Sequence, residues 1–477
     1  MPPQGLICGI SSFMCHKKVV SIFIMLMAVF GLFVSTNCLS SLLESKPAQI
    51  KTGCPFPIYY ALNESHSNSW VQQSAKGVVG FVFGVYGEDT DKHDFNRTGK
   101  LIYKTIMPDG NKKEEVVTTD KGVEKSVLLY DSNSFPHIFY AFSDNSHQVI
   151  THFYQNGGSE WLKESVIDFA NEGGKFIYEL SAAISKKNTI HLLVLKARSN
   201  PDSADFFHAY FGSHLYHVTN SSGKWEKTLI HRFDTLYTYD MHVKTQRRQD
   251  IAVDNDGYVH VVFGEQYNYD PRNDDNTIAR LHYASNKSSQ WVIELALTSS
   301  NTTDDAGWFP SLCLDKNGRP AVASTYVARV PTKSVRYTRL CYSVRGDKGE
   351  WKTVIVADED DGYYGTDGRD YTGALPHLKF DSKNRPHIVF SDVASSHNPQ
   401  CVLCAGQIRY AVLNGSSWNI STIYRQPSPK SFYTCAEMGG QCLVISEDGK
   451  KIRVVGQEMI STAKDVYTYR LVDFVIK

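Results

Sequence analysis

The sequence has no excess of charge of either sign. Its 50 lysine and arginine residues are matched by 50 aspartate and glutamate residues, so the formal net charge is zero. A chain without a net field has no general attraction for nucleic acid or for an anionic membrane surface. We therefore expect no nucleic-acid partner, and contact with a membrane only through the N-terminal segment.

The sequence also lacks the common catalytic signatures. It contains no nucleophile elbow, phosphate loop, metalloprotease helix or nucleotide-binding fingerprint. The sialidase-type Asp box, Ser-x-Asp-x-Gly-x-Thr-Trp, is absent as well, which argues against a sialidase. These absences favour binding over catalysis and leave enzymatic activity as an alternative.

One long apolar run stands near the N-terminus. Residues 1–18 form a leader that ends in His16-Lys17-Lys18, and residues 19–35 are almost wholly apolar. A basic flank before an apolar run is typical of an export signal. The run is long for a signal-peptide core and slightly short for a spanning helix. Residues 19–38 are thus predicted to be a signal peptide or a type II signal anchor, followed by a linker at 39–53. Both alternatives place the rest of the chain outside the cytosol, secreted or at the cell surface.

Asn-x-Ser/Thr sequons fit that compartment, and they predict a glycoprotein. The asparagines are Asn63, Asn96, Asn220, Asn286, Asn301, Asn414 and Asn419.

Cysteines of the exported part favour disulfides over metal binding. The candidates are Cys401, Cys404, Cys435 and Cys442. A four-thiolate zinc site is the alternative for the same residues. The spacing does not decide the pairing.

A short frame repeats along the chain and is clearest at Asp381–Asp392. A polar turn, Asp381 to Arg385, precedes Pro386-His387 and the strand-like run Ile388-Val389-Phe390. Taking Asp381 as an anchor and His387 as anchor plus six, similar frames start at other positions. The anchors are Ser74, Asp131, Ser185, Asp254, Asp315, Asp381 and Ser446.

Each unit reads as four antiparallel strands: one before the turn, one after it, a third after a variable loop, and a fourth that carries tryptophan. Four short strands per repeat are typical of a propeller blade. We predict an all-β fold, a seven-bladed β-propeller over residues 54–477. The last unit stops after a third strand, and a spare strand at 55–62 is expected to fill its fourth place and close the ring.

Long loops are predicted on one face of this ring, opposite the short repeated turns. Binding residues concentrate on such loops, and tyrosine, tryptophan, arginine and carboxylate side chains suit a sugar site. The candidates are Tyr239, Arg248, Glu265, Tyr267, Trp308, Tyr364, Arg369, His377 and Asp392. Calcium is the one cofactor that the sequence suggests, at Asp358, Asp360 and Asp361, although a solvated acidic loop explains the same residues.

The histidines at anchor plus six invite a metal-site interpretation. Because they recur in four different blades, one ion cannot collect them, and we expect them to bond nearby backbone at the blade turns. The recurring tryptophans are predicted to pack between repeats. These are Trp161, Trp225, Trp291, Trp351 and Trp418.

The repeated frame, as in Asp254-Asn255-Asp256-Gly257-Tyr258-Val259-His260, resembles the BNR-like propeller repeats of extracellular proteins, among them seven-bladed polysaccharide lyases of the ulvan-lyase type. Those residues are scaffold, so the resemblance implies a fold more than an activity. We expect a secreted or surface glycoprotein that binds a glycan or an extracellular-matrix partner. The alternatives are a lyase or glycoside hydrolase acting on an acidic polysaccharide, and a structural matrix component.

Overall fold

The computed structural model divides the chain into two compact units, Met1–Gln49 and Ile50–Lys477. All the residues that the structure describes belong to the second unit. They are 70–86, 99–119, 125–143, 148–169, 176–197, 214–233, 249–267, 278–298, 305–330, 335–358, 369–394, 407–425, 436–446, 449–463 and 466–476. The predicted leader, apolar segment, linker and closing strand lie outside these ranges. Within them, no helix is long and apolar enough to cross a membrane.

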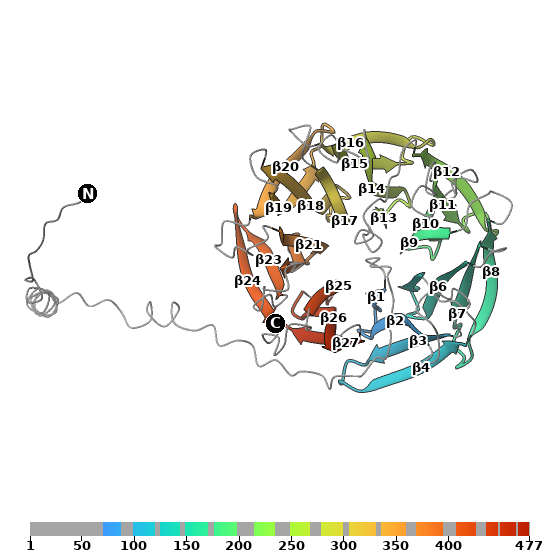
Figure 1. Ribbon diagram of the computed structural model, residues 1–477. Helices are drawn as coiled ribbons and strands as arrows, with labels where there is room; N and C mark the ends of the chain where they lie inside the picture. Colours follow the sequence, from blue (N-terminus) through green and yellow to red (C-terminus); the bar gives the residue numbers. More distant parts are fainter. Residues whose placement is uncertain are drawn as a thin grey trace, which may run out of the picture. The chain divides into compact units, whose positions relative to one another are not determined.

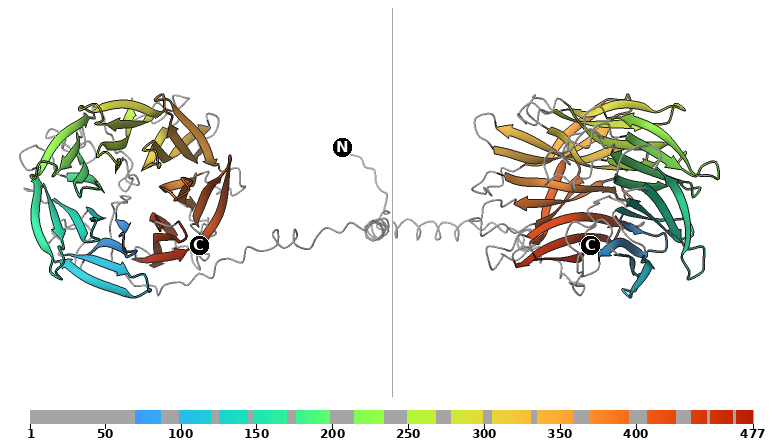
Figure 2. Two further views of the ribbon diagram at one scale, coloured as in Figure 1. Left: turned by 180° about the vertical axis from the view of Figure 1, so that it is seen from behind. Right: turned by 45° about the vertical axis from the view of Figure 1, so that its right-hand side comes forward.

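The described strands form seven blades arranged as a ring, so the predicted seven-bladed propeller is confirmed (Figures 1 and 2). Consecutive strands within each blade are antiparallel, and short parallel pairings of β15 with β17 and of β19 with β21 join blades 4, 5 and 6 into one sheet. Blades 1 to 3 comprise β1 (Val71–Gln73), β2 (Val79–Tyr86), β3 (Gly99–Ile106), β4 (Lys112–Thr118), β5 (Lys125–Tyr130), β6 (Pro136–Ser143), β7 (Gln148–Tyr154), β8 (Leu162–Asp168), β9 (Phe176–Ile184), β10 (Ile190–Ala197), β11 (His214–Thr219) and β12 (Glu226–Arg232). Blades 4 to 7 comprise β13 (Gln249–Val253), β14 (Val259–Tyr267), β15 (Ile278–Ser285), β16 (Val292–Thr298), β17 (Asp305–Leu314), β18 (Pro320–Val330), β19 (Val335–Arg345), β20 (Trp351–Ala357), β21 (Arg369–Phe380), β22 (Pro386–Ala394), β23 (Gln407–Asn414), β24 (Ser417–Arg425), β25 (Ala436–Ile445), β26 (Ile452–Ala463) and β27 (Val466–Val475).

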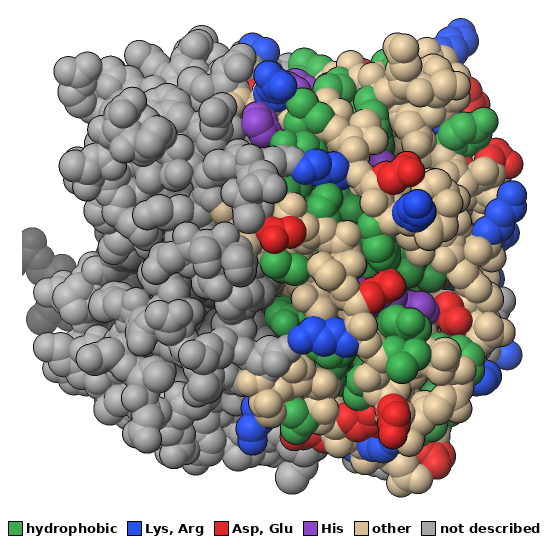
Figure 3. Space-filling model, turned by 90° about the vertical axis from the view of Figure 1, so that its right-hand side faces the viewer, with side chains coloured by type: hydrophobic (Ala, Val, Ile, Leu, Met, Phe, Trp, Pro, Cys, Tyr) green, Lys and Arg blue, Asp and Glu red, His purple; other side chains and the backbone are tan. Residues whose placement is uncertain are grey.

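The first strand of each blade lies nearest the central axis, and in blades 1 to 6 the fourth forms the outer wall (Figure 1). The seventh blade has three described strands, in the order β25-β26-β27. Residues 55–62, which we expect to supply its fourth strand, lie outside the described part. Among the described residues visible in Figure 3, charges of both signs are mixed with apolar side chains, without a patch of one sign.

The anchor residue of each frame builds the short turn. In blades 2, 4, 5 and 6 the Oδ1 atom of the anchor aspartate accepts N–H bonds from the second and fourth residues after it, at 2.7–3.0 Å. A carboxylate that caps its own turn in this way explains why aspartate recurs at the anchor. The turn of blade 7 is one residue longer, because Ser446 N–H bonds the carbonyl of Lys451. Its equivalent of His387 is therefore Arg453, and not Ile452 as the frame predicts.

The histidines at anchor plus six bond side chains on the third strand, so the expectation of backbone partners was wrong. His137 contacts His152 at 2.9 Å, and His191 contacts His217 at 3.0 Å. In blades 4 and 6, His260 and His387 bond the hydroxyls of Tyr283 and Tyr410. Each pair is confined to one blade, which agrees with the prediction that no single metal ion collects these histidines.

The recurring tryptophans pack between blades, as predicted. Each indole contacts the third-strand ring of the preceding blade, with centroids 5.3–6.1 Å apart and planes at 61–84°. The rings contacted are Tyr103, His152, His217, Tyr283 and Tyr342. Three of the indoles also donate their N–H to a glutamate of that blade, at 2.8–3.2 Å. Edge-to-face geometry of this kind stabilises aromatic pairs.

Candidate functional site

The second strands end on the face where the long loops were predicted, and there the repeat ceases to be uniform. Eleven residues after the anchor, blades 3 to 6 carry Lys196, Glu265, Tyr326 and Asp392. At anchor plus eight the same blades carry Leu193, Val262, Ala323 and Val389, all buried in the core. Scaffold positions thus give way to blade-specific polar chemistry at this end of the strands.

Most of the predicted site residues fall outside the side chains that the structure describes. Tyr239, Arg248 and Tyr364 lie outside the described residues. Three others are placed by their backbone: Tyr267 pairs with Ile278, Arg369 with Arg336, and Asp392 with Gln407. Glu265, Trp308 and His377 are the candidates with described side chains.

Glu265 lies between two histidines. Its Oε1 is 3.2 Å from His231 Nε2, and its Oε2 is 3.2 Å from His282 Nε2. His282 comes from the neighbouring strand β15, whereas His231 comes from β12 of blade 3, so the carboxylate joins two blades. Its side chain is 6% exposed, against 24% for His231 and 13% for His282.

Buried aromatic rings of the core, Phe233 and Phe263, support this cluster from behind. Phe263 stacks on His282, with centroids 5.2 Å apart at 14°, and His231 meets Phe233 edge-on at 4.8 Å. A carboxylate shared by two half-buried imidazoles can accept, hold or pass a proton, and it can bond hydroxyl groups. His231 and His282 were not predicted. Cross-strand register could have suggested His282, but nothing in the sequence brings His231 from another blade.

His377 connects two blades. It is 2% exposed, and its Nδ1 accepts the Leu443 N–H of blade 7 at 2.6 Å. The residues four before the anchor in blades 4 and 5 do the same: Asp250 accepts the Leu312 N–H at 2.8 Å, and Ser311 accepts the Leu378 N–H at 3.0 Å. We call this place the inter-blade acceptor position. It gives His377 a structural contact within the scaffold.

Trp308 lies in the first half of β17, where the pairing with β18 is irregular. Gly307 has φ of +83° and Phe309 of +52°, and Gly373 and Leu375 repeat this pair in β21 at +79° and +49°. A Cβ on Gly307 would lie 2.5 Å from Cβ of Leu281 in the preceding blade. The close approach fixes the backbone on either side of Trp308, whose side chain is half-buried.

Of the three aspartates considered for calcium, Asp358 is described, and its Oδ2 is 3.0 Å from Arg339 Nε. Asp360 and Asp361 lie outside the described residues. In the described part of the chain, no group of three or more histidine, cysteine or acidic side chains could hold a metal ion.

Cys442, the one described disulfide candidate, is buried in a core shared by blades 1, 2 and 7; Cys401, Cys404 and Cys435 lie outside the described residues. Cys313 and Cys341 are free thiols. Burial raises the pKa of both thiols, that of Cys341 to about 12, so neither is a reactive thiolate at neutral pH.

Four sequon asparagines are described. Asn220 and Asn286 lie in the third-to-fourth turns, where Oδ1 accepts the N–H of Ile190 and Val259 at 2.9 and 2.8 Å. Asn414 accepts a bond from Arg385 at 3.1 Å, and Asn419 is exposed on β24. A glycan on Nδ2 leaves the acceptor role of Oδ1 intact. Asn63, Asn96 and Asn301 lie outside the described residues.

No protein-family model and no curated protein matches the sequence. Among solved structures, an ulvan lyase of a polysaccharide lyase family is similar, with a TM-score of 0.51 at 11% identity over 88% of this chain and 96% of that one. The same kind of enzyme bound to -[GlcA(1-4)Rha3S]- gives a TM-score of 0.50 at the same identity and coverage. An α-L-arabinanase of Penicillium chrysogenum complexed with arabinobiose gives 0.44 at 12% identity, over 73% and 92% of the two chains. The expected similarity to ulvan-lyase-type propellers is confirmed at the level of the fold.

Proposed function

We propose that this propeller binds a glycan on the face where the second strands end. The observation that carries the proposal is the Glu265 carboxylate held between the partly exposed imidazoles of His231 and His282. Carboxylate and imidazole groups bond sugar hydroxyls. The similar ulvan lyase acts on a polysaccharide, which supports this choice of ligand. In this proposal the propeller works outside the cytosol, as the N-terminal segment and the sequons predict.

Cleavage of that glycan is the second candidate function. It is favoured by the two contacts of 3.2 Å, because a carboxylate within hydrogen-bond reach of imidazoles can serve in general acid–base catalysis. The substrate class in this case is an acidic polysaccharide, whose uronate group an imidazolium would neutralise.

A glycan array probed with the secreted chain tests binding. We expect retention on a subset of glycans and a loss of about tenfold in affinity for Glu265→Gln, because the amide loses the charge that orients both imidazoles. Glu160→Gln, in an exposed turn on the opposite face, is the matched control. Retention of no glycan, or equal affinity of wild type and Glu265→Gln, would overturn the proposal.

Incubation with acidic polysaccharides separates binding from cleavage. A lyase gives unsaturated products that absorb in the ultraviolet, and a hydrolase gives new reducing ends. Either product, if absent from the Glu265→Gln reaction, would establish cleavage at this cluster. Bound glycan recovered intact would leave binding as the function.

A further inference from the structure

The junction between blades 7 and 1 departs from the other described junctions. In blades 2 to 6 the tryptophan stands three residues before the fourth-strand residue that pairs with the third-strand ring. In blade 1 the third-strand ring is Tyr103, and it pairs with Glu115. The residue three before Glu115 is Lys112, which therefore occupies the tryptophan position. In blade 7 the place of the ring belongs to Asp473, which pairs with Val455. A lysine and an aspartate therefore replace the indole and the ring that pack the described junctions between blades 1 and 6.

The charges at this junction interact. Asp473 lies 3.0 Å from Arg453 Nη1. Burial raises the pKa of Asp473, and the positive charges of Arg453 and Lys112 oppose that rise. Because two flexible or short charged side chains fill less space than two aromatic rings, we expect the blades to be less tightly packed here.

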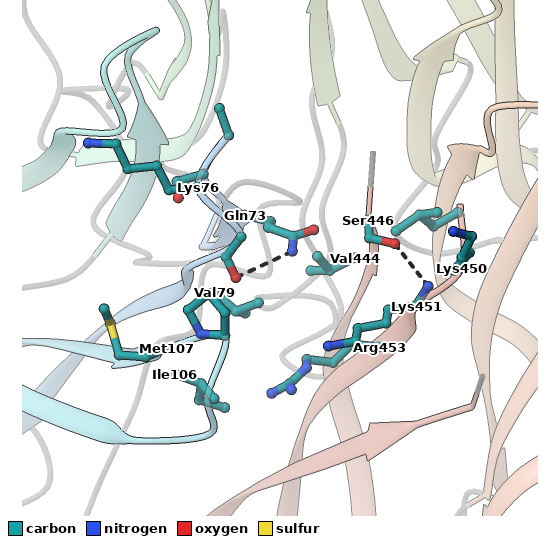
Figure 4. A pocket seen from close by; sticks show the side chains of 15 residues that line it. Gln73, Lys76, Val79, Ile106, Met107, Val444, Ser446, Lys450, Lys451 and Arg453 are labelled. Carbon is teal, nitrogen blue, oxygen red and sulfur yellow. Dashed lines mark hydrogen bonds between the residues drawn. The ribbon is translucent and has the colours of Figure 1, made fainter. Parts of the chain in front are cut away.

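A groove of about 890 Å³ lies beside this junction, on the face of the short turns. The turns β1–β2 and β3–β4 form one side of it, and the turn β25–β26 forms the other (Figure 4). Its apolar floor includes Val79, Ile106 and Val444, and Met107 is 39% exposed at its edge.

The rim of the groove is basic. Lys76 comes from blade 1, and Lys450, Lys451 and Arg453 come from blade 7 (Figure 4). Among the described residues that line the groove there is no carboxylate and no aromatic ring. Two acidic residues of the same turn, Glu447 and Asp448, lie outside the described residues.

We propose that this groove is a docking site for an acidic peptide segment of a partner protein that also carries apolar side chains. The lysines supply charge complementarity: Lys450 and Lys451 lie on the blade 7 side, and Lys76, whose ammonium lies 6.0 Å from the Phe135 ring centre, lies on the blade 1 side. Arg453 is paired with Asp473. The apolar floor takes side chains such as leucine. A glycan fits less well, since no ring lines the groove for a sugar to stack on. The site lies on the face opposite Glu265, so it is independent of the proposed glycan site.

A display library of random peptides selected on the full secreted chain tests the proposal. We expect peptides that combine aspartate or glutamate with apolar residues, and about tenfold weaker binding of those peptides to Lys76→Glu/Lys451→Glu, with affinity falling as salt rises. The matched control is Lys187→Glu/Lys316→Glu, which makes the same charge change in exposed turns of blades 3 and 5 on the same face. Equal thermal unfolding midpoints of the two variants show that the ring is intact.

Several results would overturn the proposal. These are the absence of any peptide that distinguishes the two variants, the selection of basic peptides, and preferential binding of a sulfated oligosaccharide that is lost only in Lys76→Glu/Lys451→Glu. Self-association of the chain that only this variant abolishes would assign the groove to a second copy instead. Loss of glycan-array retention in Glu265→Gln with peptide binding unchanged would separate the two sites.

Discussion

Two buried histidines of blade 3 are neutral at physiological pH. His191 and His217 stack with centroids 5.2 Å apart and share a hydrogen bond. Burial lowers the pKa of His191 to about 4 and that of His217, which also lies beside His191, to about 3. In the unfolded chain both titrate near 6.5, so below that pH the unfolded state binds more protons and the folded state loses stability as pH falls.

We expect the free energy of unfolding to decrease between pH 7 and 4.5, by roughly 2 kcal/mol for each of these histidines. His217→Tyr places in blade 3 the residue that blades 1, 4, 5 and 6 carry, and it removes one titrating group. Denaturant unfolding at the two pH values should then show a smaller difference for the variant. An unchanged difference would mean that His217 is charged in the folded state.

A second residue-scale feature is the close approach at Gly373. Its φ is +79°, and an added Cβ would lie 2.7 Å from Leu340 Cβ and 2.8 Å from Leu340 Cα. Gly318 has nearly the same φ, +74°, but nothing within 4 Å of an added Cβ. Substitutions at Gly318 test the effect of backbone strain alone, whereas substitutions at Gly373 add the steric contact with Leu340.

We expect Gly318→Ala to lose about 1 kcal/mol from the positive φ alone. Gly373→Ala should lose a further 1–3 kcal/mol, approximately, because Leu340 backbone must move. Denaturant midpoints of both variants measure the difference. Equal losses of stability would show that the backbone of β21 around Gly373 can shift away from Leu340 without a further free-energy cost.

Among the secondary-structure elements, the first strands of neighbouring blades are joined by hydrogen bonds that fix their relative position. The inter-blade acceptor position carries Asp250, Ser311 and His377, three chemically different side chains with one task. Each bonds a backbone N–H three residues before the next anchor. Because these N–H groups are buried, each needs an acceptor.

Ser311→Ala is expected to cost about 1–3 kcal/mol, since it leaves the buried Leu378 N–H without this acceptor. Hydrogen exchange at Leu378 should accelerate relative to Leu312, whose acceptor Asp250 is unchanged. Ser311→Asn, which restores an oxygen acceptor, is the comparison. If Ser311→Ala left both the stability and the exchange rates unchanged, the bond would contribute nothing to the junction.

At the scale of the whole molecule, closure depends on the last blade. β27 is the outermost described strand of blade 7, and the predicted strand at 55–62 is the expected partner of its outer edge. An unpaired edge of that length would expose a row of backbone groups.

A chain that starts at residue 66 should therefore unfold at a lower temperature than one that starts at residue 40, and it should aggregate more readily. Thermal scans and light scattering at matched concentrations measure both effects. Indistinguishable transitions would mean that residues 40–65 do not contribute to closure.

The number of blades and the order of their strands could be predicted from the repeated sequence frame. The anchor aspartate, its turn and the buried run after it depend on neighbours within ten residues. The hydrogen bonds that Asp254 and Asp381 accept lie within the turn itself, so the turn can be recognised from a short stretch of sequence. The tryptophan positions and the separation of the repeated histidines into different blades were predicted because each recurs at one place in the repeat, although the tryptophans contact rings of the preceding blade.

The contacts between residues of different blades could be read from the folded structure but not from the sequence. The partners of His387, the pairing of Glu265 with His231, and the replacement of an indole–ring contact by Lys112 and Asp473 all join residues from different strands or blades. Such contacts depend on the rotation between neighbouring blades and on the register of the strands. No local pattern in the sequence specifies either of these.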